Sequence, residues 1–93
     1  MNVMLKCQVS PGQFTGECAV KIQLHDDKWV SLFLPVEAVE IQGALSDEDP
    51  VDGYIEVNVI DQEGGLTLVR LPRPTLENGQ HLTVKADAIQ QEA

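Results

Sequence analysis

The chain has 93 residues, 43% of them hydrophobic and only 4% aromatic, so it can bury one largely aliphatic core and is too short for two domains. Its 15 acidic and 6 basic residues give a formal net charge of -9, which repels nucleic-acid phosphates and anionic lipid surfaces. We therefore expect neither nucleic acid nor membrane as a partner.

The same sequence predicts a cytoplasmic protein. Residues 1–6 do not show a basic stretch followed by an apolar run and a small-residue cleavage site. No segment approaches the roughly 18 apolar residues that a membrane helix needs. Cys7 and Cys18 do not have the spacing of a zinc or redox motif. We expect them to be two reduced thiols in the core.

Alternation of apolar and polar residues, the period of a strand with one buried face, begins at once. Residues 2–10 and 17–25 are the first two predicted strands. Their core-facing residues are Val3, Leu5, Cys7 and Val9 in the first and Cys18, Val20, Ile22 and Leu24 in the second. Asp26-Asp27 predicts a two-residue turn, because short acidic side chains tolerate the backbone angles of tight hairpins.

A third strand over residues 28–34 follows that turn. The predicted register pairs Trp29 with Leu24 and Phe33 with Val20, which places both aromatic residues on the core face. The opposite face then carries Val30, Leu32 and Leu34, which must be covered by other segments of the chain or by a partner. These three residues are the candidate partner-binding surface. Homodimerisation through an open strand edge is the other way to cover such a sheet.

Residues 35–52 break the alternation. Pro35 cannot donate a ladder hydrogen bond, and residues 36–41 fit either a short helical turn, which we favour, or an edge strand. Residues 42–52 form a predicted loop with a block of negative charge.

The alternation resumes in the second half of the chain. Residues 53–59, 66–71 and 81–86 are predicted strands, joined by the glycine-bearing loop 61–65 and by the Asn78-Gly79 turn. Pro72 and Pro74 prevent continued pairing between the last two. No internal repeat can be aligned in the sequence.

Six short strands at roughly even spacing predict a mainly β fold in a single domain over residues 1–93. We expect a small antiparallel barrel or two orthogonally packed sheets, of SH3-like size, with at most one short helical turn.

The sequence contains no catalytic or phosphate-binding motif, so we expect no enzyme activity and no cofactor. The predicted function is a protein-protein interaction or assembly module, with another protein or a second copy of the chain as its partner. The alternative is a Ca²⁺-binding domain, because the loop offers the hard carboxylate oxygens of Asp47, Glu48, Asp49 and Asp52. Their spacing does not match that of an EF-hand.

Overall fold

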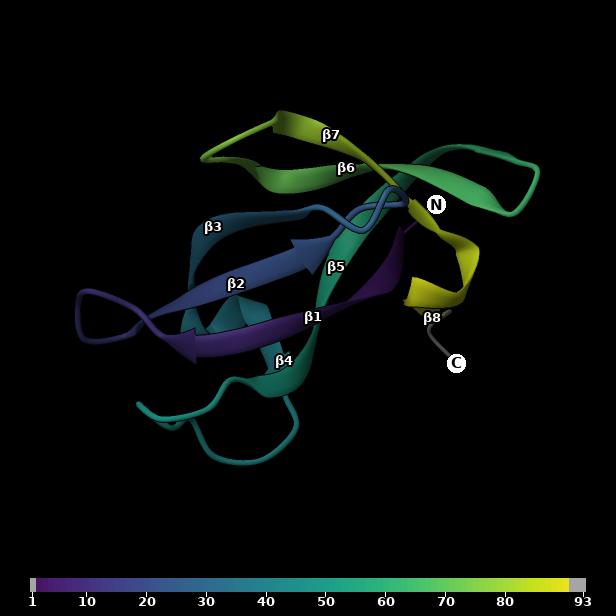
Figure 1. Ribbon diagram of the computed structural model, residues 1–93. Helices are drawn as coiled ribbons and strands as arrows, with labels where there is room; N and C mark the ends of the chain where they lie inside the picture. The colour runs from purple at the N-terminus through teal and green to yellow at the C-terminus, as the bar shows by residue number, and fades with distance from the viewer. Residues whose placement is uncertain (1, 91–93) are drawn as a thin grey trace.

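The computed structural model describes residues 2–90, which form one curled antiparallel sheet (Figure 1). Six strands follow one another across the sheet in the order β3-β2-β1-β5-β6-β7, and two short strands, β4 and β8, pair with β5 and β1. The strands are β1 (Asn2–Pro11), β2 (Glu17–Gln23), β3 (Trp29–Pro35), β4 (Val39–Ile41), β5 (Val51–Glu63), β6 (Leu66–Thr75), β7 (Gly79–Lys85) and β8 (Ile89–Gln90).

The predicted mainly β class is confirmed. The antiparallel sheet curls into a half-barrel. Residues 2–90 contain two 3₁₀ turns where the sequence predicted at most one: η1 (Val36–Ala38), which leads into β4, and η2 (Ala86–Ala88), which leads into β8. Residues 36–41 thus contain both alternatives, a turn and then a strand. Among residues 2–90, no helix is long and apolar enough to cross a membrane.

The core is aliphatic, as the composition requires, and the curled sheet encloses it. The buried faces predicted for the first two strands are confirmed, except that Leu24 is only partly buried. The buried hydrophobic residues of the second half are Ile55, Val57, Val69, Leu71, Leu82 and Val84.

The register predicted for the second and third strands is wrong by one residue. The loop between them has three residues rather than two: Leu24 and Lys28 flank it, the Leu24 amide bonds the Lys28 carbonyl at 2.7 Å, and the Asp27 amide bonds the Leu24 carbonyl at 3.0 Å. Asp27 takes the left-handed conformation, with φ of 69°, that such a loop needs after its turn. Trp29 consequently pairs with Gln23. Because a slip of one residue turns every side chain to the other face, Trp29 points away from the core.

The strand registers reveal an internal repeat that could not be aligned in the sequence. Leu5 of β1 pairs with Ile89 of β8, and Ile55 of β5 pairs with Val39 of β4. An offset of 50 residues converts one pair into the other, and Leu5 and Ile55 are themselves partners. A pseudo-twofold axis therefore passes through the Leu5–Ile55 pair.

The two halves also agree in their other pairings and in their loops. Val9 pairs with Val20 in the first half as Val59 pairs with Val69 in the second, so the offset is 50 in β5 and 49 in β6. Each 3₁₀ turn is fixed by an amide that donates at 2.9 Å to a glycine carbonyl, Val36 to Gly16 and Ala86 to Gly65. Both glycines have left-handed φ angles, 83° and 80°. Each half is thus three strands, a 3₁₀ turn and a short strand paired with the other half.

The close packing of β4 and β1 against β5 explains why residue 53 is a glycine. A Cβ atom on Gly53 of β5 would lie 2.6 Å from Cγ2 of Val9 and 2.9 Å from the carbonyl oxygen of Glu40. Real Cβ atoms do not approach neighbours this closely, and backbone oxygen in a ladder cannot move aside cheaply. Glycine at this position lets β4 lie against β5.

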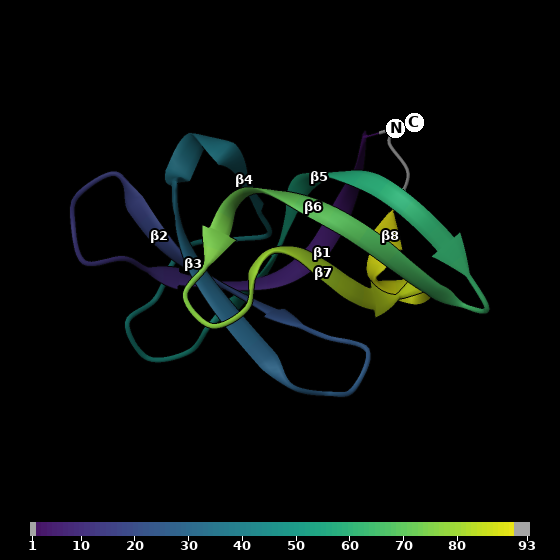
Figure 2. The same cartoon turned by 90° about the horizontal axis from the view of Figure 1, so that it is seen from above.

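The hairpin tips connect the two ends of the curled sheet. The His25 amide at the β2–β3 tip donates to the Thr83 carbonyl of β7 at 3.0 Å, and the Leu76 amide at the β6–β7 tip donates to the Ser31 carbonyl of β3 at 2.8 Å. Figure 2 shows these hairpins crossing, while the β1–β2 and β5–β6 loops project from opposite ends of the molecule. Each half therefore touches the other at both its first strand and its hairpin.

The observed register and the register predicted from the sequence differ in which face of β3 contributes more to the free energy of unfolding. Leu32→Ala should lower the free energy of unfolding by about 2–5 kcal/mol, because it opens a cavity in the core. Phe33→Ala, on the other face of the same strand, should cost less. Urea denaturation of both variants checks this, and a larger loss for Phe33→Ala would support the two-residue turn instead.

Candidate functional site

The residues proposed from the sequence as a partner surface do not form one. Val30, Leu32 and Leu34 have exposures of 3%, 1% and 1% and belong to the core. The three-residue hairpin loop is the physical reason, because it turns these residues inward and Trp29 outward. The candidate surface must therefore be sought on the other face of β3.

The four acidic residues proposed as Ca²⁺ ligands do not converge. Asp47, Glu48 and Asp49 lie exposed in the loop that precedes β5, and Asp52 is the second residue of that strand. The Asp52 carboxylate accepts a 2.7 Å hydrogen bond from Gln8 Nε2. Across residues 2–90, no group of three or more His, Cys, Asp or Glu side chains is arranged to hold a metal ion.

The two cysteines are buried core residues that do not form a disulfide. Burial raises the pKa of the Cys7 thiol from 9.0 to about 12, and Cys18 and Asp52 add smaller contributions in the same direction. Burial, with a further contribution from Glu17, also raises the pKa of Cys18. Both groups stay protonated at neutral pH, when a reactive cysteine would be a thiolate.

An exposed groove lies around Trp29, the only tryptophan of the chain. We call it the Trp29 groove. It has a volume of about 650 Å³ and is lined by Gln8, Lys21, Trp29, Val30, Ser31, Pro50 and Glu77. The lining comes from the first three strands, from the end of the acidic loop and from the β6–β7 tip. Trp29 is 49% exposed, so about half of a large aromatic side chain faces water.

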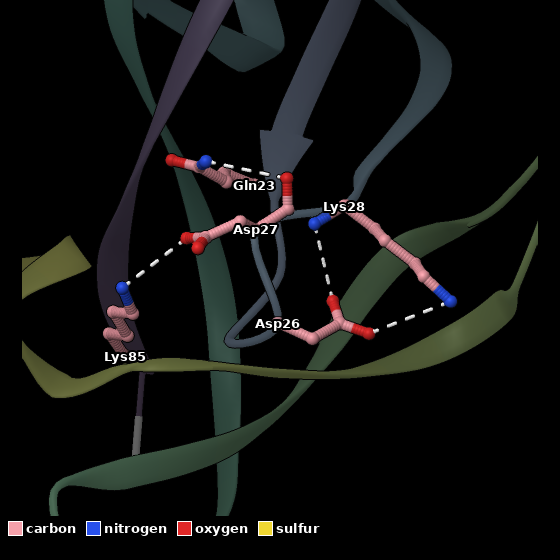
Figure 3. A network of polar contacts seen from close by, with 5 residues as sticks. All are labelled: Gln23, Asp26, Asp27, Lys28 and Lys85. Carbon is pink, nitrogen blue, oxygen red and sulfur yellow. Dashed lines mark hydrogen bonds and ion pairs between the residues drawn. The ribbon is translucent and has the colours of Figure 1, made fainter.

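A second, more polar hollow of about 320 Å³ adjoins the first, since Gln8 and Trp29 line both. Its other lining residues include Lys6, Gln23 and Lys85. Figure 3 shows how Lys85 of β7 reaches the β2–β3 tip, where its Nζ lies 3.3 Å from Oδ1 of Asp27. The backbone carbonyl of Asp27 in turn accepts a 3.5 Å hydrogen bond from Gln23 Nε2.

Glu77 lines the Trp29 groove and is held there by Ser31. Its Oε1 accepts a 2.8 Å hydrogen bond from the Ser31 amide, and its Oε2 accepts a 3.0 Å bond from the Ser31 hydroxyl. The bond from the Ser31 amide is the main reason that the pKa of Glu77 is lowered, and nearby Lys21 contributes. The groove therefore keeps a charged carboxylate at neutral pH beside an exposed aromatic ring.

The repeat shows which of these side chains the fold itself requires. The offset of 50 residues relates Lys6 to Glu56 and Gln8 to Asn58, while the offset of 49 relates Lys21 to Arg70. The corresponding surface of the second half, a hollow lined by Glu56, Arg70 and other residues, thus exists without a tryptophan. Since the backbone does not demand an exposed ring there, Trp29 is a candidate for recognition.

Comparison with known proteins gives no further guidance: no family model matches the chain, and neither the curated proteins nor the solved structures contain a match. The groove is therefore the feature from which a function can be proposed. It could not be predicted from the sequence, because Glu77 and Ser31 are 46 residues apart and only the fold brings them together.

The cysteine environment leads to a labelling prediction. At about pH 8 a thiol reagent should modify Cys7 and Cys18 of the native protein only at the rate at which the fold opens. After denaturation it should modify both rapidly. Because burial disfavours the Cys7 thiolate in the folded state, the free energy of unfolding should also fall as the pH rises from 9.0 to about 12, where only the unfolded chain ionises this thiol. Mass spectrometry of timed labelling checks the first point, and rapid labelling without unfolding would contradict thiol burial.

Proposed function

We propose that the protein is a non-enzymatic interaction module that binds another protein through the Trp29 groove. The observation that carries this proposal is the half-exposed Trp29 in a wide surface groove. Large aromatic side chains contribute much of the binding energy at protein interfaces, because they bury a large area with little loss of conformational entropy. Isolated exposed apolar residues are ordinary, but this ring forms part of a concave surface.

The titratable groups with shifted pKa values support a binding role over a catalytic one. The pKa values of Cys7 and Cys18 are raised by burial, which makes both thiols poor nucleophiles. The pKa of Glu77 is lowered, and its carboxylate is held by Ser31. A general base for neutral pH is usually tuned in the opposite direction. None of the three groups is prepared as an acid, base or nucleophile.

Docking on the groove is also better supported than docking on a strand edge. The outer edge of β3 is occupied at Ser31 by the Leu76 amide and the Glu77 carboxylate. The Thr83 carbonyl of β7 is occupied by the His25 amide. These contacts reduce the free ladder groups that a second copy of the chain would need. We place the module in the cytoplasm, since its two cysteines, which do not form a disulfide, suit a reducing compartment.

Trp29→Ala tests the proposal directly. Immobilised wild-type protein should retain at least one protein from a native lysate that the Trp29→Ala variant retains at least about tenfold less well, a typical loss for a central aromatic contact. Quantitative mass spectrometry of the eluates measures this ratio.

Phe14→Ala is the matched control, because Phe14 is 70% exposed but lies in the β1–β2 loop, outside the groove. Retention of the same protein should be unchanged in this variant. Circular dichroism melting of both variants shows whether the fold is intact. If no retained protein distinguishes Trp29→Ala from Phe14→Ala, the groove is not the interaction surface.

A further inference from the structure

The charge distribution narrows the kind of partner. We infer that the Trp29 groove binds an extended basic segment of a partner protein, with an arginine or lysine side chain stacked on Trp29 and directed toward Glu77. This inference depends on the proposed function and adds the chemical class of the occupant.

Charge complementarity is the first argument for a basic occupant. The chain has a formal net charge of -9, and such a field attracts cationic partners and raises their association rate. Acidic residues also border the groove. Pro50 in its wall follows Asp49 directly, and Gln8 in its wall is hydrogen-bonded to Asp52. A basic segment would therefore be attracted from a distance by the net charge of the chain and near the groove by Asp49 and Asp52. Lys21 in the lining and Lys6 and Lys85 in the adjoining hollow oppose this attraction.

The chemistry of the groove itself is the second argument. An indole face attracts a guanidinium or ammonium group, and tryptophan is the best of the aromatic side chains at this. Trp29 and Glu77 line the same groove, so a cation over the ring lies in a groove that also carries a carboxylate. Because Ser31 already holds Glu77 in place, little side-chain entropy is lost when the cation binds.

Lys21 supplies a test with the opposite sign. It lines the groove and lies close enough to Glu77 to lower the pKa of that carboxyl group. A basic occupant is repelled by Lys21, whereas an acidic occupant would be attracted by it. Removing this charge should therefore strengthen binding of a basic peptide and weaken binding of an acidic one.

A random peptide library displayed on phage provides the probe. Selection on wild-type protein, with Trp29→Ala used for counter-selection, should yield peptides enriched in arginine and lysine and depleted in aspartate and glutamate relative to the input. Free synthetic copies of the selected peptides should change the fluorescence of Trp29 on titration, which locates them at the groove. Their affinity should fall as salt is raised from about 50 mM to about 300 mM.

Two pairs of variants then distinguish the effect of charges in the groove on peptide affinity from the effect of the net charge of the chain. Glu77→Gln should weaken binding of the selected basic peptides by about threefold to tenfold, while Glu63→Gln, the same charge change at a residue of β5 that does not line the groove, should leave their affinity unchanged. Lys21→Gln should strengthen binding, whereas Arg73→Gln, its matched control on β6, should not. Melting curves confirm that each variant folds.

Selection of acidic or neutral peptides, or of none that depend on Trp29, would overturn the inference. Equal effects of Glu77→Gln and Glu63→Gln would also overturn it, because binding would then follow net charge alone. If a lysate protein still depends on Trp29 in either case, the proposed function stands and only the basic character of the partner is wrong.

Discussion

The antiparallel pairing of β1 with β5 is the constraint on which the rest of the structure depends. These strands pair from Asn2 with Asn58 to Val9 with Val51, and the Leu5–Ile55 pair lies on the pseudo-twofold axis. Each of the two strands also receives the short final strand of the opposite half. Neither half is therefore a complete sheet without the other. The single core follows from this arrangement, because both inner faces close over the same aliphatic side chains.

The sequence predicts the buried faces well, because the alternation of apolar residues is a local property of each strand. It fails at the β2–β3 hairpin, where the left-handed Asp27 adds one loop residue and reverses the faces of β3. The repeat escapes a sequence comparison because equivalent positions preserve the kind of residue more than its identity, as with Val39 and Ile89 or Glu37 and Asp87. The groove is beyond such reasoning, since distant segments build it.

The repeat explains how a candidate site can arise without disturbing the fold. The two halves carry the same inward pattern, while their outward positions differ in size and charge. Lys6 corresponds to Glu56, and Gln8 to Asn58. The outer surface of the first half is thus free to specialise while β1 and β5 keep the core intact. The Trp29 groove lies on this surface, and the β6–β7 tip of the other half contributes Glu77 to its lining.

Backbone nuclear Overhauser contacts between the short strands and the two central strands test this arrangement most directly. The pseudo-twofold arrangement predicts contacts from Val39 to Ile55 and from Ile89 to Leu5, each joining one half of the chain to the other. Contacts from Val39 to Leu5 and from Ile89 to Ile55 would mean that each half closes on itself. That result would contradict the pseudo-twofold exchange of short strands and the groove built upon it.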